Sequence, residues 1–181
     1  MKSILIATLI LAATAQAGEL EISATTQRAG RLLYRHALSG PVYGVGLWGL
    51  ASDQYAGPIR RQGAAYSPSW TQVSGSVSAV QAGAGLGLRR DRLRVDALAI
   101  YHDLNTNLTT TYYTTTGPPY SMPTAGPGNA WTLDLGASYQ FPVSSQISLS
   151  IGAGYRWDLS QIEPYRLEGA FASAGLVIQL P

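Results

Sequence analysis

The chain has 181 residues, of which only 12% are charged, with 20 glycines, no cysteine and a formal net charge of +2. Ordinary soluble domains carry about 25% charged residues, and so little basic charge gives nucleic-acid binding no support. The length suits one domain. No segment beyond the N-terminal region is apolar for long enough to form a transmembrane helix, which excludes a helical inner-membrane protein.

Residues 1–17 have the three parts of a secretory signal peptide. Lys2 supplies a positive charge, residues 4–13 are mostly apolar, and Ala15-Gln16-Ala17 is a small-x-small cleavage site. The apolar run is too short to cross a bilayer as a helix. We therefore expect an exported protein with one mature domain, residues 18–181.

Three strands are predicted in the first part of this domain. Residues 19–27 alternate between apolar and polar side chains, and residues 31–38 form a second strand of ambiguous phase. The third strand has an apolar face made of Tyr43, Val45 and Leu47. The segment 52–69 has no sustained period and predicts a long loop.

Alternation returns in the middle of the chain. Residues 80–88 and 93–101 each have one apolar face, and a short charged turn separates them. Val73 and Val77 are out of phase with the first of these strands, which indicates a bulge or a strand leaving the membrane zone. The Thr-rich segment 105–128 predicts a second long loop.

The clearest pattern is a hairpin over residues 131–159. Odd positions in both arms are apolar, and even positions are polar, charged or glycine. The apolar face is aliphatic in the middle and aromatic at its ends, which favours a lipid bilayer because Trp and Tyr prefer the membrane–water interface. Residues 168–180 form a last alternating strand after a shorter loop around 161–164.

These segments predict an all-β protein, a closed antiparallel transmembrane barrel of eight strands. Short turns alternate with longer connections, as expected for a barrel in the outer membrane with short periplasmic turns. Closure is required because an open sheet edge in hydrocarbon leaves backbone groups unpaired. The pattern predicts aromatic girdles at both interfaces, made of Tyr101, Trp131, Tyr155 and Trp157 on the outer side and Tyr43, Tyr139 and Phe141 on the periplasmic side.

Charged residues on the opposite faces are expected to point into the lumen. These candidates are Glu21, Arg94, Asp96, Asp134, Arg156 and Glu168. Because buried charges need partners, we expect the two arginines to pair with the carboxylates. Such a network predicts a lumen plugged by side chains, with a small pore as the alternative.

The strand that ends in Gly152-Ala153-Gly154-Tyr155-Arg156-Trp157-Asp158, with the signal peptide and the last strand, resembles small outer-membrane barrels of the OmpA-like, OmpX-like and opacity-type families. The resemblance covers the mature chain and implies an outer-membrane protein with a structural or surface-interaction role. One departure concerns the C-terminus, because these barrels usually end in an aromatic residue read by the assembly machinery. Here the last residues are Gln179-Leu180-Pro181.

Catalysis, cofactors and metals receive little support from the sequence. The only histidines are His36 and His102, too few and too far apart for a metal site. His36 and Ser39 are three residues apart and so fall on opposite strand faces. Two alternatives remain open, namely a lipid A-modifying enzyme and a secreted soluble barrel that binds an apolar ligand, with its aliphatic faces inward.

The expected partners follow from the membrane setting. They are outer-membrane lipid and lipopolysaccharide, the barrel-assembly machinery during biogenesis, and a surface ligand held by the long loops, with the protein a monomer. Arg60 and Arg61 are candidates to contact lipopolysaccharide phosphate. The alternative is that these two arginines are simply solvated charges in a loop.

Overall fold

The computed structural model describes residues 18–57, 59–62, 69–114, 117–124, 126, 128–160 and 167–180. The expected signal peptide, residues 1–17, lies outside this part of the chain. The described residues form antiparallel strands, namely β1 (Gly18–Thr25), β2 (Ala29–Ser39), β3 (Val42–Ala56), β4 (Arg60–Gln62), β5 (Ser69–Arg90), β6 (Leu93–Thr114), β7 (Tyr120–Thr124), β8 (Asn129–Pro142), β9 (Ile147–Asp158) and β10 (Gly169–Gln179). None of the described segments is a helix capable of crossing a membrane.

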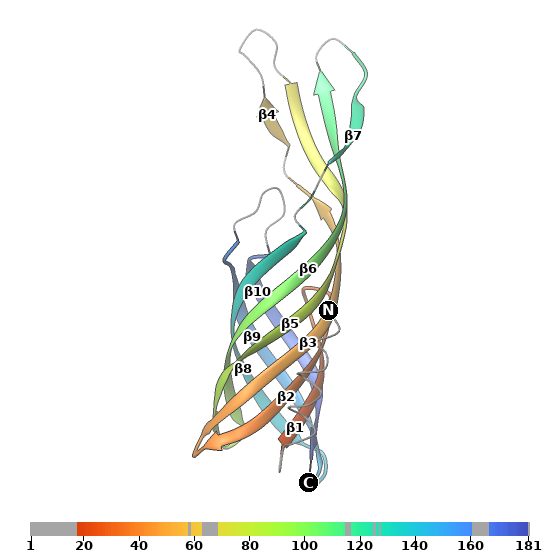
Figure 1. The fold of residues 1–181 in the computed structure, drawn as a ribbon. Helices are drawn as coiled ribbons and strands as arrows, with labels where there is room; N and C mark the ends of the chain where they lie inside the picture. The colour runs from red at the N-terminus through yellow and green to blue at the C-terminus, as the bar shows by residue number, and fades with distance from the viewer. Residues whose placement is uncertain are drawn as a thin grey trace.

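Eight of these strands form a closed ring (Figure 1). The order around the ring is β5, β3, β2, β1, β10, β9, β8 and β6, and pairing between β5 and β6 closes it. The hairpin of β8 and β9 pairs Asp134 with Arg156, and β1 pairs with β10 to join the two ends of the domain. The predicted eight-stranded antiparallel barrel is confirmed.

The strands β5 and β6 are 22 residues each and project far beyond the ring (Figure 1). Their register is continuous from Ser69–Thr114 to Arg90–Leu93, and β4 and β7 pair with their outer ends. The result is a projecting sheet of β4, β5, β6 and β7. Much of the segments 52–69 and 105–128, which we expected to be loops, is therefore strand. Their Thr and Tyr residues favour strands, but outside the membrane nothing requires apolar and polar residues to alternate.

The two ends of the ring differ in their connections. The turns after β2, β5 and β8 are short and lie at the same end as Gly18 and Leu180, whose backbones are hydrogen-bonded. The projecting sheet and the β9–β10 connection lie at the other end. One short turn, around Arg28, also lies at this end, with Arg28 in the left-handed region (φ 53°). By the usual polarity of outer-membrane barrels, the short-turn end is periplasmic.

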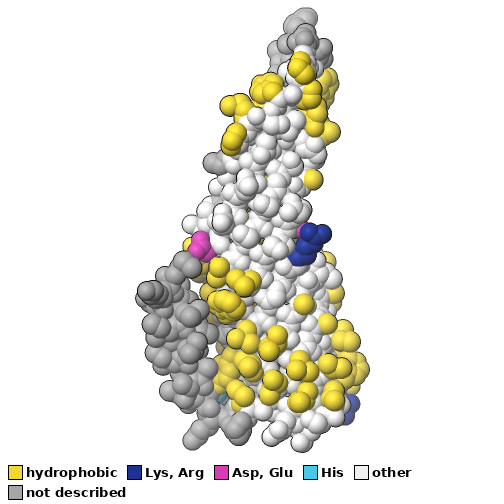
Figure 2. Space-filling model, turned by 90° about the vertical axis from the view of Figure 1, so that its right-hand side faces the viewer, with side chains coloured by type: hydrophobic (Ala, Val, Ile, Leu, Met, Phe, Trp, Pro, Cys, Tyr) yellow, Lys and Arg dark blue, Asp and Glu magenta, His cyan; other side chains and the backbone are white. Residues whose placement is uncertain are grey.

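The wall of the barrel has an apolar exterior. Along β8 and β9 the exposed side chains are the apolar ones predicted from the sequence, and the buried positions carry polar, charged and small residues. On β10 the predicted apolar face is again outward, but the buried positions carry Phe171 and Val177. Figure 2 shows hydrophobic side chains gathered over the lower part of the molecule, with charged groups at their upper boundary. Exposed members of this belt include Ile22, Leu86, Leu135, Leu149, Ile151 and Leu176. A soluble ligand-binding barrel has the reverse sidedness, so that alternative is wrong.

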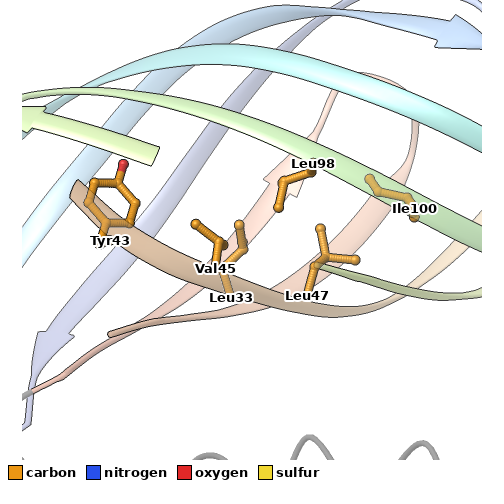
Figure 3. Close-up of a cluster of buried hydrophobic side chains, with 6 residues drawn as sticks. All are labelled: Leu33, Tyr43, Val45, Leu47, Leu98 and Ile100. Carbon is orange, nitrogen blue, oxygen red and sulfur yellow. The ribbon is translucent and has the colours of Figure 1, made fainter. Parts of the chain in front are cut away.

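The prediction for β3 was wrong in its phase. Tyr43, Val45 and Leu47 point into the barrel, where they join Leu33, Leu98 and Ile100 in a buried apolar cluster (Figure 3). Tyr43 is only 6% exposed and is not part of a periplasmic girdle. The physical reason is space, because the neighbouring strand β5 carries glycines at its inward positions 83, 85 and 87. These glycines leave room for the large side chains of β3 and β6.

Candidate functional site in the barrel lumen

The interior charges form three clusters, each with one residue shared between two partners of opposite charge. In the outermost cluster Asp134 on β8 accepts two hydrogen bonds of 2.7 Å from Arg156 on β9 and one of 2.9 Å from Arg31 on β2. All three side chains are buried. Phe171 on β10 lies against both guanidinium groups, with ring-centre distances of 5.3 Å to Arg31 and 6.0 Å to Arg156, so cation–π attraction supports the cluster.

The middle cluster reverses the charges. Arg35 on β2 donates to Glu21 on β1 and to Asp96 on β6, each at 2.7 Å. Tyr43 donates its hydroxyl hydrogen to the second oxygen of Asp96 at 2.5 Å. The inward position of Tyr43 therefore has a polar role, because its hydroxyl group donates to the Asp96 oxygen that Arg35 does not bind.

The third cluster lies at the periplasmic end of the lumen and is centred on Glu19. It accepts hydrogen bonds from buried Arg94 on β6, from Arg89 at 2.8 Å and from Gln179 at 2.7 Å. From the periplasmic end outward, the clusters therefore carry two basic and one acidic group, then one basic and two acidic, then two basic and one acidic. The alternation lets each cluster offset the excess charge of its neighbour, which reduces the cost of burying ions.

Sequence reasoning identified part of this network. The structure places Glu21, Arg94, Asp96, Asp134 and Arg156 inside, but the partner of Arg94 is Glu19. The prediction that Glu168 points into the lumen was wrong, because its side chain is exposed and accepts a 3.1 Å hydrogen bond from Tyr155 on the outer wall. It lies just before β10, where the alternation no longer holds. The residues missed were Glu19, Arg31, Arg35 and Arg89. Glu19 is two residues from Glu21 on β1 and so lies on the same face. On β2, Arg31, Leu33 and Arg35 share one face, but the ambiguous phase of this strand concealed that this face is inward.

Two glycines shape the lumen around these clusters. A Cβ atom added at Gly87 would lie 2.3 Å from the ring of Tyr43 and 2.5 Å from the Asp96 carboxylate. At Gly154 it lies 2.6 Å from the ring of Phe171. Both positions therefore exclude a side chain so that an aromatic ring can reach the charged groups.

The clusters and the apolar residues divide the lumen into unequal spaces. A cavity of about 320 Å³ lies toward the outer mouth, lined among others by Gln81, His102 and Arg156. Another of about 280 Å³ lies at the periplasmic mouth beside Glu19 and Arg89. Between them the space beside Arg31, Arg35 and Asp134 is only about 50 Å³, room for one or two water molecules.

The two histidines lie apart and on different faces. His102 is fully buried, with Nδ1 3.4 Å from the Gln81 amide nitrogen and Nε2 2.9 Å from the Thr132 hydroxyl. His36, on β2, lies at an outward position paired with Gly44 and Gly18. In the part of the chain that the structure describes, neither histidine lies beside both a carboxylate and an exposed nucleophile. Among the described residues, no three His, Cys, Asp or Glu side chains are grouped to hold a metal ion.

Six of the seven girdle candidates are on the outer wall. They touch in pairs, with ring centres 5.2 Å apart for Tyr101 and Trp131, 5.0 Å for Tyr155 and Trp157, and 4.9 Å for Tyr139 and Phe141. The first two pairs lie toward the end that bears the projecting sheet, and the third lies toward the short turns. Aromatic rings thus flank the aliphatic belt on both sides.

Arg60 and Arg61 lie in the projecting sheet, where Arg61 pairs with Trp70, and Trp70 with Tyr113. Trp70 is twelve residues beyond Ala82, the partner of Tyr101, or about 40 Å along the strand. These arginines are therefore far from the phosphates of lipid A at the membrane surface.

Comparisons with known proteins give structural neighbours only. No protein-family model matches the chain, and no curated protein matches it. The outer-membrane protein Ail of Yersinia pestis is 11% identical, with a TM-score of 0.49 over 91% of this chain and 99% of that one. CarO of Acinetobacter baumannii is 12% identical (TM-score 0.42, 91% and 97% covered), and the N-terminal barrel domain of Pseudomonas aeruginosa OprF is 11% identical (TM-score 0.40, 92% and 98% covered).

The chain is similar to small outer-membrane β-barrels. Its own geometry gives the same result independently of these similarities. Eight paired strands close on themselves, aliphatic side chains face outward between two sets of aromatic rings, and ions are buried inside. This is the arrangement of a barrel that spans the bacterial outer membrane.

Proposed function

We propose that this protein is a structural outer-membrane barrel whose plugged lumen anchors a projecting sheet for contacts outside the cell. The observation that carries the proposal is the division of the molecule into two parts. The barrel is filled by side chains, and two of its strands continue far beyond it as the projecting sheet. Outer-membrane lipid and lipopolysaccharide surround the belt, and the barrel-assembly machinery inserts the protein, which acts as a monomer.

The plug rests on the middle of the lumen. Arg35 is fixed by two carboxylates, and Asp134 by two arginines, so these side chains cannot swing aside without leaving a buried charge unpaired. On the other side of the lumen, Leu47, Leu98 and Ile100 fill the space with apolar atoms. A hydrated ion crossing this level has to displace one set or the other.

The contact role rests on the composition of the projecting sheet. Thr and Ser are its most frequent residues, and aromatic residues lie on both faces. Tyr112 and Tyr120 stack at 4.9 Å on one face, while Trp70 pairs with Tyr113 on the other. Tyrosine and tryptophan provide rigid contact area with a polar edge, which is common in recognition surfaces.

Planar-bilayer recording tests the plug. We expect the purified, refolded protein to give no steady conductance at physiological salt. A large, stable channel current from protein that is folded by gel mobility contradicts the plug and favours a small pore instead.

Truncation of the sheet tests the contact role. Two short linkers remove β4, β7 and the outer aromatic residues but keep the ring, one from Ala56 of β3 to Ser74 of β5 and one from Thr109 of β6 to Asn129 of β8. We expect normal amounts of heat-resistant folded barrel in the outer membrane and a loss of adhesion between cells or to a host-cell layer. Unchanged adhesion, or loss of the barrel itself, contradicts the separation of anchor and contact surface.

A further inference from the structure

The outer cavity of the lumen has features that the anchoring role does not use. It lies above the charge plug and measures about 320 Å³, near the lower end of the range for small-molecule sites. One wall is apolar, made of Val77, Ala79 and Leu104. The floor is polar, with Gln81 and His102 from paired positions on β5 and β6.

Two side-chain oxygens on the cavity wall are buried without a hydrogen-bond partner. They are Oε1 of Gln81 at the floor and Oε1 of Gln27 near the rim. Each residue uses its amide nitrogen elsewhere, Gln81 toward His102 and Gln27 toward the Gly169 carbonyl at 3.3 Å. Gln81 is only 1% exposed, so its unpaired oxygen is costly unless a ligand or water donates to it.

The charges around the cavity differ between its two ends. Asp53 and Glu168 lie at the rim, where Oδ1 of Asp53 forms a 3.4 Å ion pair with exposed Arg28 and accepts a 2.8 Å hydrogen bond from the Gln54 backbone N–H. Beneath the floor, Arg31 and Arg156 share the single carboxylate of Asp134. A cationic group is therefore favoured at the rim and disfavoured at the floor.

We propose that this cavity binds a small amphipathic amine that carries a hydroxyl group at its opposite end. The ammonium group lies at the rim and donates to Gln27 Oε1 and the Asp53 carboxylate. The apolar body packs against Val77, Ala79 and Leu104, and the hydroxyl donates to Gln81 Oε1. The inference goes beyond the anchoring role and does not depend on the projecting sheet.

The spacing of the polar groups fits a molecule of this size. Asp53 is paired with Val77 and Gly49 with Gln81, so rim and floor are four residues apart, or about 13 Å along the strands. The side chains of Asp53 and Gln81 span part of this distance. A phenol with a two-carbon amine arm bridges the remainder, and a lipid chain with a large headgroup does not fit.

Calorimetric titration of the refolded protein in micelles tests the proposal, with tyramine as the probe. We expect saturable one-to-one binding at millimolar concentration or below. Phenethylamine lacks the hydroxyl and 4-ethylphenol lacks the amine, so each should bind about tenfold more weakly, the value of one good hydrogen bond or ion contact. The anion 3-(4-hydroxyphenyl)propionate should not bind.

Variants locate the site. Gln81→Leu should weaken tyramine about tenfold and leave phenethylamine unchanged, whereas Asp53→Asn should weaken both amines alike and reduce the salt dependence. Gln72→Leu, on the same strand outside the cavity, is the matched control. If Gln81→Leu fails to fold by gel mobility, Asp53→Asn at the exposed rim decides alone. Absence of saturable tyramine binding, or equal binding of 4-ethylphenol, overturns the proposal.

Discussion

At the residue scale, four buried arginines determine what the lumen can be. Each of them forms an ion pair with a carboxylate on another strand. The four are Arg31, Arg35, Arg94 and Arg156. Buried ion pairs contribute little net stability when intact, but they are expensive to break, because the remaining charge stays buried. The carboxylates therefore act as positional constraints on the ring, and their removal is the sharpest test of the network.

Asp134→Asn removes the negative charge that two buried arginines share. We expect the free energy of unfolding to fall by about 3–5 kcal/mol, the usual cost of breaking a buried pair, measured by urea titration of the protein in micelles. Asp91→Asn is the control, since Asp91 lies in the exposed β5–β6 turn with φ 55°, a conformation that Asn tolerates. Equal stability of the two variants contradicts a structural role for the Asp134 cluster.

Gly87→Ala tests the packing of Tyr43 against Asp96. The added methyl group overlaps the Tyr43 ring and the Asp96 carboxylate, so we expect a loss of about 1–3 kcal/mol, as for other overpacked interiors. Gly30→Ala is the matched control, because a Cβ at Gly30 meets nothing within 4 Å. The same urea titration compares them, and a Gly87→Ala barrel as stable as Gly30→Ala shows that Tyr43 does not occupy this position.

The sequence allowed some residue positions to be predicted and hid others. Asp134 and Arg156 were placed inside because their strands alternate cleanly between apolar and polar residues. Tyr43 was placed outside because its side of β3 is the more apolar one. That rule fails where the lumen itself contains an apolar cluster, and Leu33 between Arg31 and Arg35 obscured β2 for the same reason.

At the element scale, β5 and β6 pass through two environments. Inside the ring their outward residues are apolar, as at Leu86, Leu88 and Val95. Beyond it they become Thr-rich and lose the contrast between faces, while the backbone pairing continues unbroken. Alternation of apolar and polar residues therefore marks the part of a strand that lies in the membrane and not the strand as a whole. The belt segments were therefore predictable, and the projecting sheet was mistaken for loops.

Leu135→Arg tests the lipid-facing belt. Leu135 is exposed on the outer wall of β8, midway between Trp131 and Tyr139. A charge near the centre of the bilayer costs about 2–4 kcal/mol in barrels of this type, which we expect as lower folding stability in lipid vesicles. Val143→Arg, in the exposed β8–β9 turn, should have little effect. If both substitutions are tolerated equally, the outer wall of β8 does not face lipid.

At the scale of the whole molecule, the barrel has two distinct ends. Arg60 and Arg61 lie in the projecting sheet, whereas Arg89, Arg90 and Arg92 surround the β5–β6 turn at the opposite end. The four lumen arginines lie between these groups and are buried. Arginine positions thus label the outer surface, the interior and the periplasmic surface of one chain. This distribution makes the orientation and the closure of the barrel accessible to a single experiment.

That experiment is trypsin treatment of intact cells, followed by mass spectrometry of the cut sites. We predict cleavage after Arg60 or Arg61 in intact cells, cleavage after Arg90 or Arg92 only once the outer membrane is permeabilised, and protection of Arg31, Arg35, Arg94 and Arg156 in both conditions. Cleavage after Arg90 or Arg92 in intact cells contradicts the orientation. Cleavage at the lumen arginines in either condition contradicts the closed barrel itself.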